Sequence, residues 1–156
     1  MEKKNKKQGP KTLGALGRHL LVELRDCAPG ILNNLEKVKN ILVRAAKKSG
    51  ATIIVVSFYE LNPFGIISIN GMVIIAESHL SIRTWPEYDY AAVDIFTCGD
   101  LIKPEVAAQY LIERFESKNP SLIEIKRGYF PDADILVHKP EGAGPPPQTD
   151  MAKVLS

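Results

Sequence analysis

The feature that most constrains the fold of this chain is a succession of short β-branched and apolar runs between residues 51 and 98. The runs are ATIIVVSFYEL (51–61), MVIIAES and HLSIRTW (72–85), and YAAVDIFTC (90–98). The middle runs are joined by connections of hairpin length. Such connections link antiparallel strands, because parallel neighbours need a crossover of a dozen or more residues. The centre of the chain therefore predicts a mainly antiparallel sheet.

The individual strands differ in how clearly the sequence marks them. Residues 51–61 are predicted to be a buried strand, because the apolar run is short and continuous and its β-branched composition disfavours a helix fragment. Residues 62–71 (NPFGIISING) predict a loop or an irregular strand entry, since they contain a proline and two glycines. Residues 72–85 predict two consecutive strands or one continuous strand. GRHLLVELRDC (17–27) and SLIEIKRGYF (121–130) predict the first and last strands.

A helix is predicted between the first two strands. Asn33 or Asn34 can cap its first free amides, and Gly50 terminates it after a basic last turn. Its apolar positions recur three or four residues apart at Leu35, Val38, Ile41, Leu42 and Ala45.

A second helix is predicted to begin at Pro104 and to run to about residue 118. Its apolar face is formed by Val106, Tyr110, Leu111 and Phe115. The order of elements is then β-α-β-β-β-α-β. This order predicts an α+β fold, a two-layer α/β sandwich in which a mainly antiparallel sheet carries both helices on one face.

Length and charge limit the class of protein. A chain of 156 residues with 45% hydrophobic positions forms one domain, which we place at 13–138, between a basic disordered arm (1–12) and a disordered tail (139–156). No apolar run approaches the roughly 20 residues that span a bilayer, and no signal peptide is recognisable, so we expect a soluble, cytoplasmic protein with no membrane partner. The arm has a net charge of +4 and the rest of the chain −2, and the body lacks a basic patch with interleaved aromatics. We therefore expect no nucleic-acid partner.

Several common kinds of site are excluded by residue types and spacing. Cys27 and Cys98 are too few for a disulfide framework and lack metal-ligand spacing, so we expect free thiols and no metal. No glycine-rich phosphate loop is present. In an extended strand His79 points to the face opposite its neighbour Ser78 and cannot act as its base. His19 and His138 can approach a site only through the fold, so a conventional hydrolase is not supported.

The segment ESHLSIRTWPEYDYAAVDIFTCG (77–99) carries the most specific signal. A serine at a strand end is most often a surface hydroxyl, but here Trp-Pro-Glu follows it and a Thr-Cys-Gly ends the next strand. Together with GRHLLVEL and ATIIVVSF, this segment resembles the short prokaryotic S-adenosylmethionine decarboxylases, from about Gly17 to Pro104. The chain is identified as a member of that family.

The resemblance implies that the chain cleaves itself between Glu77 and Ser78. The serine hydroxyl attacks the carbonyl of Glu77 and converts the peptide bond to an ester. A β-elimination then releases a chain that ends in Glu77 and leaves a pyruvoyl group at the position of Ser78. This covalent cofactor is a ketone that can bond to a substrate amine and accept the electrons released with carbon dioxide, as pyridoxal phosphate does in other enzymes.

The resemblance also implies roles for residues around the pyruvoyl group. Cys98 matches the catalytic acid that reprotonates the substrate carbanion, and Glu87 matches the acidic residue that binds the ribose hydroxyls. Leu80 and Trp85 are implied in substrate binding. The family pattern is a homodimer of cleaved protomers with active sites near the interface.

Two positions depart from the family. Arg83 stands where the family has the histidine that promotes the elimination step, and a guanidinium stays protonated and cannot remove a proton. We expect it to stabilise charge in the intermediate or to bind a carboxylate. In FGIISINGM, Asn70 takes the place of the family's processing serine, and Ser68 is a hydroxyl two residues away. Both are candidate processing helpers.

Three functions follow from these features. The first is a self-processing pyruvoyl-dependent S-adenosylmethionine decarboxylase that serves spermidine biosynthesis. The second is a pyruvoyl-dependent arginine or ornithine decarboxylase of the same family, because Arg83 is a new fixed cation and the loop before the cleavage site has changed. The third is an uncleaved regulatory paralogue. Cleavage would give chains of 77 and 79 residues in place of one of 156.

Overall fold

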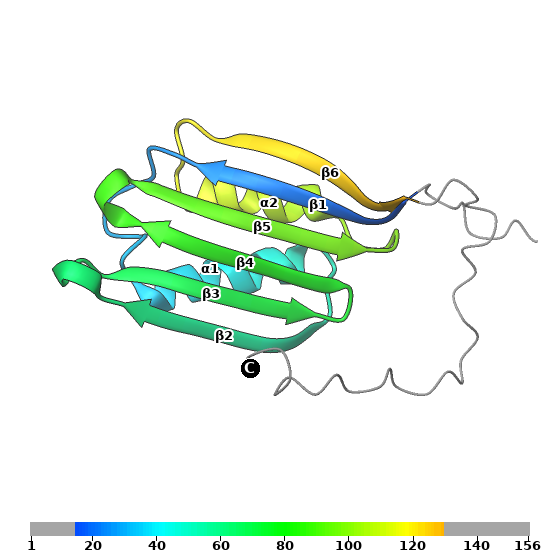
Figure 1. Ribbon diagram of the computed structural model, residues 1–156, viewed down its shortest axis with the longest axis horizontal. Coiled ribbons are helices and arrows are strands. Elements are labelled where there is room, and N and C mark those ends of the chain that lie inside the picture. Colours follow the sequence, from blue (N-terminus) through cyan, green and yellow to red (C-terminus); the bar gives the residue numbers. More distant parts are fainter. Residues whose placement is uncertain (1–14, 130–156) are drawn as a thin grey trace, which may run out of the picture.

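The computed structural model describes residues 15–129, which form one antiparallel sheet and two helices (Figure 1). The strand order is β2-β3-β4-β5-β1-β6, and every neighbouring pair is antiparallel. The strands are β1 (Ala15–Leu24), β2 (Ile53–Leu61), β3 (Ser68–Ile75), β4 (Ser78–Trp85), β5 (Tyr90–Cys98) and β6 (Ser121–Tyr129). The helices are α1 (Leu35–Lys48) and α2 (Pro104–Arg114), and both lie on one face of the sheet. The predicted α+β sandwich is confirmed.

The predicted arm and tail lie outside the described residues, so the domain limits 13–138 stay a prediction. In the described part of the chain, no helix is long and apolar enough to cross a membrane.

Both helices begin where the sequence predicts. The side chain of Asn34 accepts a hydrogen bond from the Lys37 N–H at 2.9 Å and caps α1. Gly50 follows that helix with φ of +89°, a conformation that costs glycine little. Helix α2 starts at Pro104 but ends four residues earlier than expected, because Glu116 takes a left-handed conformation just beyond it.

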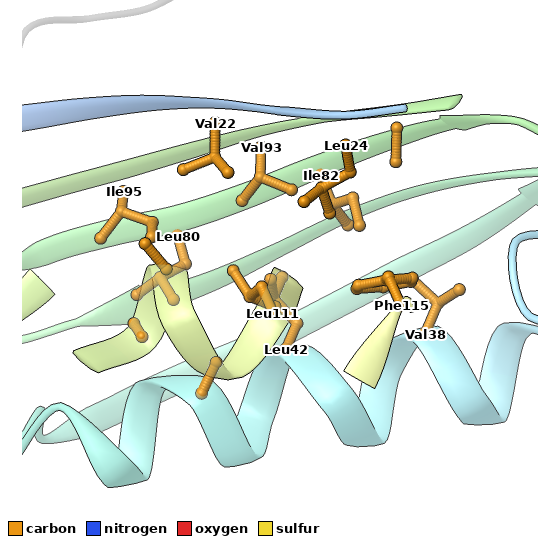
Figure 2. Close-up of a cluster of buried hydrophobic side chains, with 14 of the residues drawn as sticks. Val22, Leu24, Val38, Leu42, Leu80, Ile82, Val93, Ile95, Leu111 and Phe115 are labelled. Carbon is orange, nitrogen blue, oxygen red and sulfur yellow. The ribbon is translucent and has the colours of Figure 1, made fainter. Parts of the chain in front are cut away.

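The core lies between the helices and the inner face of the sheet (Figure 2). Leu80 and Ile95 project from adjacent strands toward the helices, and Leu42 and Leu111 meet them from α1 and α2. The prediction that Val106 belongs to the buried face of α2 was wrong, since this side chain is 38% exposed. The buried positions of α2 are Pro104, Ala107, Ala108 and Leu111, with Phe115 just beyond the helix end.

The prediction that residues 51–61 form a buried strand was half wrong. They do form the strand β2, but it lies at the sheet edge, where Ile54 is 61% exposed and Tyr59 is 64% exposed. A continuous apolar run is typical of a strand covered on both faces. Here the helices cover only one face of the sheet, and β2 has a neighbouring strand on one side only.

The remaining connections agree with the sequence. Residues 62–71 form a 3-10 turn (Pro63–Gly65) and then enter β3. The predicted loop or irregular strand entry is confirmed. Residues 72–85 form two strands joined by a two-residue turn, Ala76 and Glu77.

The face of the sheet away from the helices, called here the outer face, has no cover in the described protomer (Figure 1). Side chains alternate between the two faces of a strand, so residues next to the buried ones lie on it. Its exposed apolar side chains include Met72, Ile74, Ile123 and Ile125. Apolar surface left in this way on one face of a thin sandwich is typical of a contact surface.

Candidate active site

The predicted cleavage point lies at the β3–β4 turn. Glu77 ends the turn and Ser78 is the first residue of β4, while Cys98 is the last residue of β5. Because β4 and β5 are antiparallel, the start of one strand lies beside the end of the other, and Ser78 pairs with Thr97 (Figure 1). The backbone N–H of Cys98 donates a hydrogen bond to the Glu77 carbonyl oxygen at 2.8 Å. The fold thus brings Glu77, Ser78 and Cys98 together.

The turn is held in place by the segment before β2. The Ala76 N–H donates to the carbonyl of Thr52 at 2.8 Å, and the Thr52 N–H donates to Glu77 Oε2 at 3.2 Å. The carboxylate of Glu77 is therefore occupied, while its carbonyl faces the Cys98 amide. A backbone N–H aimed at a carbonyl stabilises the negative charge that develops there when a nucleophile attacks.

Ser78 has a strained backbone. Its φ is +141°, in a region that residues with a side chain seldom occupy and that costs about 1–3 kcal/mol. The strain lies at the bond where self-cleavage is predicted. Breaking that peptide bond would free the backbone of Ser78 from this conformation.

The prediction that the side chain of His79 points away from Ser78 was wrong. Ser78 Oγ lies 3.3 Å from His79 Nδ1. The prediction assumed an extended strand with alternating side chains, but at φ of +141° Ser78 departs from that geometry. The positive φ leaves no mark in the sequence, so only the histidine next to the serine could have pointed to this contact.

His79 is partly enclosed on the outer face. Its ring meets the ring of Phe96 edge to face, with centroids 5.8 Å apart, and His19 packs on the same phenylalanine at 5.4 Å. Burial lowers the pKa of His79 below the ordinary value, and the nearby Asp94 opposes that shift. The imidazole is therefore held in its neutral form at neutral pH.

The two cysteines differ in environment. Cys98 is exposed at the end of β5, where Gly99 turns the chain with φ of +79°. Cys27 is buried and lies 3.6 Å from the carbonyl oxygen of Leu24, and burial raises the pKa of its thiol to about 11. Only Cys98 presents a thiol beside the cleavage point.

A second group of predicted residues lies toward the other end of β4. Arg83 pairs in register with Asn70 of β3, and its guanidinium lies 5.5 Å from the ring centroid of Trp85. Trp85 stacks on Tyr90 at 5.3 Å. Among the described residues, Arg83 Nε is buried and has no hydrogen-bond partner. This group presents a fixed cation and an aromatic surface.

Tyr90 is tied to β1. Its hydroxyl donates to Glu23 Oε2 at 2.5 Å, and burial together with this hydrogen bond raises the pKa of Tyr90 to about 12. The phenol therefore stays neutral and holds the ring against which Trp85 stacks.

The two groups of residues are far apart in one protomer. Arg83 is five residues along β4 from Ser78, about 17 Å at the rise of a strand. Glu87 lies further on, exposed in the 3-10 turn Pro86–Tyr88.

The side chains of two other predicted residues do not reach the cleavage point. Leu80 points into the core (Figure 2), and Ser68 is buried at the start of β3, where its hydroxyl donates to the Leu61 carbonyl at 3.5 Å. In the described part of the chain, no three His, Cys, Asp or Glu side chains converge to hold a metal ion.

The geometry around Ser78 is suited to a proenzyme, a chain that breaks its own backbone through an ester. A serine hydroxyl, a strained backbone conformation at that serine and a hydrogen-bond donor to the preceding carbonyl are all in place. The family model for S-adenosylmethionine decarboxylase matches residues 18–128. The chain belongs to the S-adenosylmethionine decarboxylase family, as the sequence motifs predicted.

Individual relatives support this assignment. The S-adenosylmethionine decarboxylase proenzyme of Thermodesulfovibrio yellowstonii is 68% identical over 114 residues, which are 73% of this chain and 82% of the relative. That of Clostridium kluyveri is 50% identical over 118 residues, 76% of this chain and 91% of the relative. The crystal structure of the adenosylmethionine decarboxylase from Aquifex aeolicus is 32% identical, with a TM-score of 0.69 over 76% of this chain and 95% of that one.

The strain at Ser78 is testable in chains that cannot cleave. Glycine adopts a positive φ without strain, whereas alanine adopts it only with strain. Ser78→Gly should therefore be more stable to urea than Ser78→Ala. The expected difference is about 1 kcal/mol, because relief of strain exceeds the chain entropy that glycine adds. Both variants should stay full length.

The matched control uses Ser81, which lies in the same strand. Ser81→Gly and Ser81→Ala, each built in the Ser78→Ala chain, lose the same hydrogen bond to Asp94. There the glycine variant should be the less stable one. If glycine also destabilises position 78 relative to alanine, the backbone there is not strained.

Proposed function

We propose that this chain is a self-processing pyruvoyl-dependent decarboxylase that converts S-adenosylmethionine to its decarboxylated form. The observation that carries the proposal is the hydrogen bond from the Cys98 amide to the carbonyl of Glu77, beside a strained Ser78. The activity is the one named for the relatives, and the processing chemistry is the one that this geometry supports.

Processing begins with the hydroxyl of Ser78. Its Oγ attacks the carbonyl carbon of Glu77, and the oxygen that becomes negative is the one to which the Cys98 N–H donates. Breaking the carbon–nitrogen bond gives an ester and a free amine and releases the strain at Ser78. A β-elimination then cuts the chain after Glu77, and hydrolysis with loss of ammonia leaves the pyruvoyl group.

The surroundings of residue 78 fit this group. It would stand at the start of β4, where it supplies a ketone that takes up electrons as carbon dioxide leaves. The exposed thiol of Cys98 ends the neighbouring strand and is the proton donor to the substrate carbon. Cys98 thus has two roles in sequence, its amide during processing and its thiol during turnover.

We infer that a second copy completes the site. The apolar outer face is uncovered in one protomer, and Arg83 is about 17 Å from Ser78 on the same strand. With a two-fold axis in that interface and perpendicular to β4, the partner's β4 would run in the opposite direction. This arrangement would bring the partner's Arg83, Trp85 and Glu87 toward Ser78. Glu87 would then bind the ribose hydroxyls, and the Trp85–Tyr90 stack would present an aromatic surface to the adenine.

A second candidate substrate is favoured by one observation. Arg83 Nε is buried without a hydrogen-bond partner in the described chain, so the guanidinium has an unused donor. A carboxylate matches that donor geometry. Arginine or ornithine, which need no ribose contact, would then be decarboxylated by the same cofactor.

The substrate is tested by release of labelled carbon dioxide from carboxyl-labelled S-adenosylmethionine, arginine and ornithine. We expect release from S-adenosylmethionine, and Glu87→Gln should weaken its binding by about 1.5–3 kcal/mol without slowing cleavage. Release from arginine or ornithine alone would identify the second candidate. An intact wild-type chain of full mass with no release from any substrate would identify an uncleaved paralogue.

Replacement of Cys98 separates its two roles. Cys98→Ala keeps the backbone N–H, so intact mass should still show the two fragments, while turnover should fall by about 10²–10⁴ because the proton donor is lost. Cys27→Ala is the control, since that thiol is buried next to Asp89, at the opposite end of β5 from Cys98. Wild-type turnover by Cys98→Ala would place the acid elsewhere.

The composite site predicts complementation between protomers. In a dimer of one Ser78→Ala and one Arg83→Ala protomer, the intact serine meets the partner's Arg83. The Arg83→Ala protomer should therefore be cleaved faster than in its own homodimer, on the order of 100-fold. The control pairs Arg83→Ala with a double variant, Ser78→Ala with Arg83→Ala. Equal cleavage rates in both pairings would show that Arg83 does not act across the interface.

A further inference from the structure

We propose that His79 is the general base of self-processing, and that its Nδ1 takes the proton of the Ser78 hydroxyl as Oγ attacks Glu77. The inference rests on the proposed self-cleavage and adds to it a residue that the family comparison did not supply. The hydroxyl proton of Ser78 needs an acceptor as Oγ attacks. Arg83 stays protonated and lies five residues along β4 from Ser78, so it cannot be that acceptor in the same protomer.

The contact between the two side chains carries the proposal. Nδ1 of His79 is 3.3 Å from Oγ of Ser78, close to hydrogen-bond distance, and such contacts tighten as a reaction proceeds. When the ring proton is on Nε2, Nδ1 accepts from the hydroxyl. The positive φ of Ser78 makes this contact between sequence neighbours possible, and the edge of Phe96 packs against the imidazole.

Other acidic or basic groups are occupied or distant. The Glu77 carboxylate accepts a hydrogen bond from the Thr52 N–H at 3.2 Å. The Asp94 carboxylate lies 3.1 Å from His19 Nε2 and accepts from the Ser81 hydroxyl at 3.2 Å. Among the described groups, His79 is therefore the base in contact with the serine.

The charges around His79 support a neutral imidazole. Burial lowers its pKa most, His19 and Arg127 lower it further, and Asp94 raises it. A base must be unprotonated to act, and a lowered pKa keeps His79 in that form at more acidic pH than an ordinary histidine. The rate of ester formation should therefore rise with pH and level off below the usual histidine range.

The proton balance of the step is complete within the chain. As Oγ bonds to the carbonyl carbon of Glu77, its proton moves to Nδ1 of His79, and the carbonyl oxygen becomes negative beside the Cys98 amide. When the intermediate collapses, the carbon–nitrogen bond breaks and the nitrogen of residue 78 takes the proton from His79. The imidazole ends neutral, and no other reactant is consumed.

The test follows newly made chain by intact mass and by hydroxylamine, which cleaves the ester but not the amide. Wild type, His79→Asn and His79→Gln are synthesised in a cell-free system and sampled over time at several pH values. Both variants should form ester and fragments about 100-fold more slowly than wild type, and the chain that accumulates should resist hydroxylamine. The inflection that the wild-type rate of ester formation shows with pH should be absent from both variants.

The control is His19→Gln, which removes a histidine from the same phenylalanine while retaining a donor toward Asp94. At neutral pH, where His79 is neutral, it should process at the wild-type rate. Urea unfolding of the accumulated full-length chain checks that each variant is folded. The pH profile of the wild-type rate is a second test, which does not depend on any variant being folded.

The outcomes separate the inference from the function on which it rests. Ester formation at the wild-type rate in His79→Asn or His79→Gln, or a wild-type rate that does not depend on pH, would overturn the role of His79. A variant that accumulates hydroxylamine-sensitive ester would assign His79 to the elimination and would also overturn it. A folded wild-type chain that never cleaves would instead refute self-processing itself.

Discussion

The antiparallel pairing of β4 with β5 is the constraint on which the site depends. It sets the first residue of β4 beside the last residues of β5, so that Glu77 and Cys98 meet although they are 21 positions apart in the chain. The hydrogen bond from the Cys98 amide to the Glu77 carbonyl extends this ladder by one step beyond the strand. A contact that completes the sheet is thus also the contact that would polarise the bond at the proposed cleavage point.

The two faces of the sheet carry different kinds of residues. The helices cover the inner face and bury the apolar side chains that stabilise the fold, including Leu80, which lies two residues from the cleavage point. The outer face carries His79, Arg83 and Cys98 among exposed apolar side chains. Because strand residues alternate, the single short strand β4 contributes residues both to the core and to the candidate site.

Much of the fold and part of the site could be predicted from the sequence. The caps of α1, the proline that begins α2 and the hairpin-length connections are local signals, and each appeared where expected. The edge position of β2 could not be predicted, because its apolar run is the same whether a helix covers it or not. Val106 was assigned to the buried face of α2 for a related reason. Helical spacing shows which residues share a face, but not how much of that face the sheet and α1 cover.

For the site, the resemblance of the motif to the family marked Glu77 and Ser78 as the predicted cleavage point and Cys98 as the predicted proton donor. Only the tertiary structure decided that His79 contacts Ser78, that Arg83 is distant from it in the same protomer, and that Leu80 faces the core. The physical reason is that residue types determine which chemistry a chain can perform. Backbone conformation and strand pairing determine which of those residues meet. The positive φ of Ser78 and the register of β4 depend on the whole sheet, and no local pattern in the sequence records them.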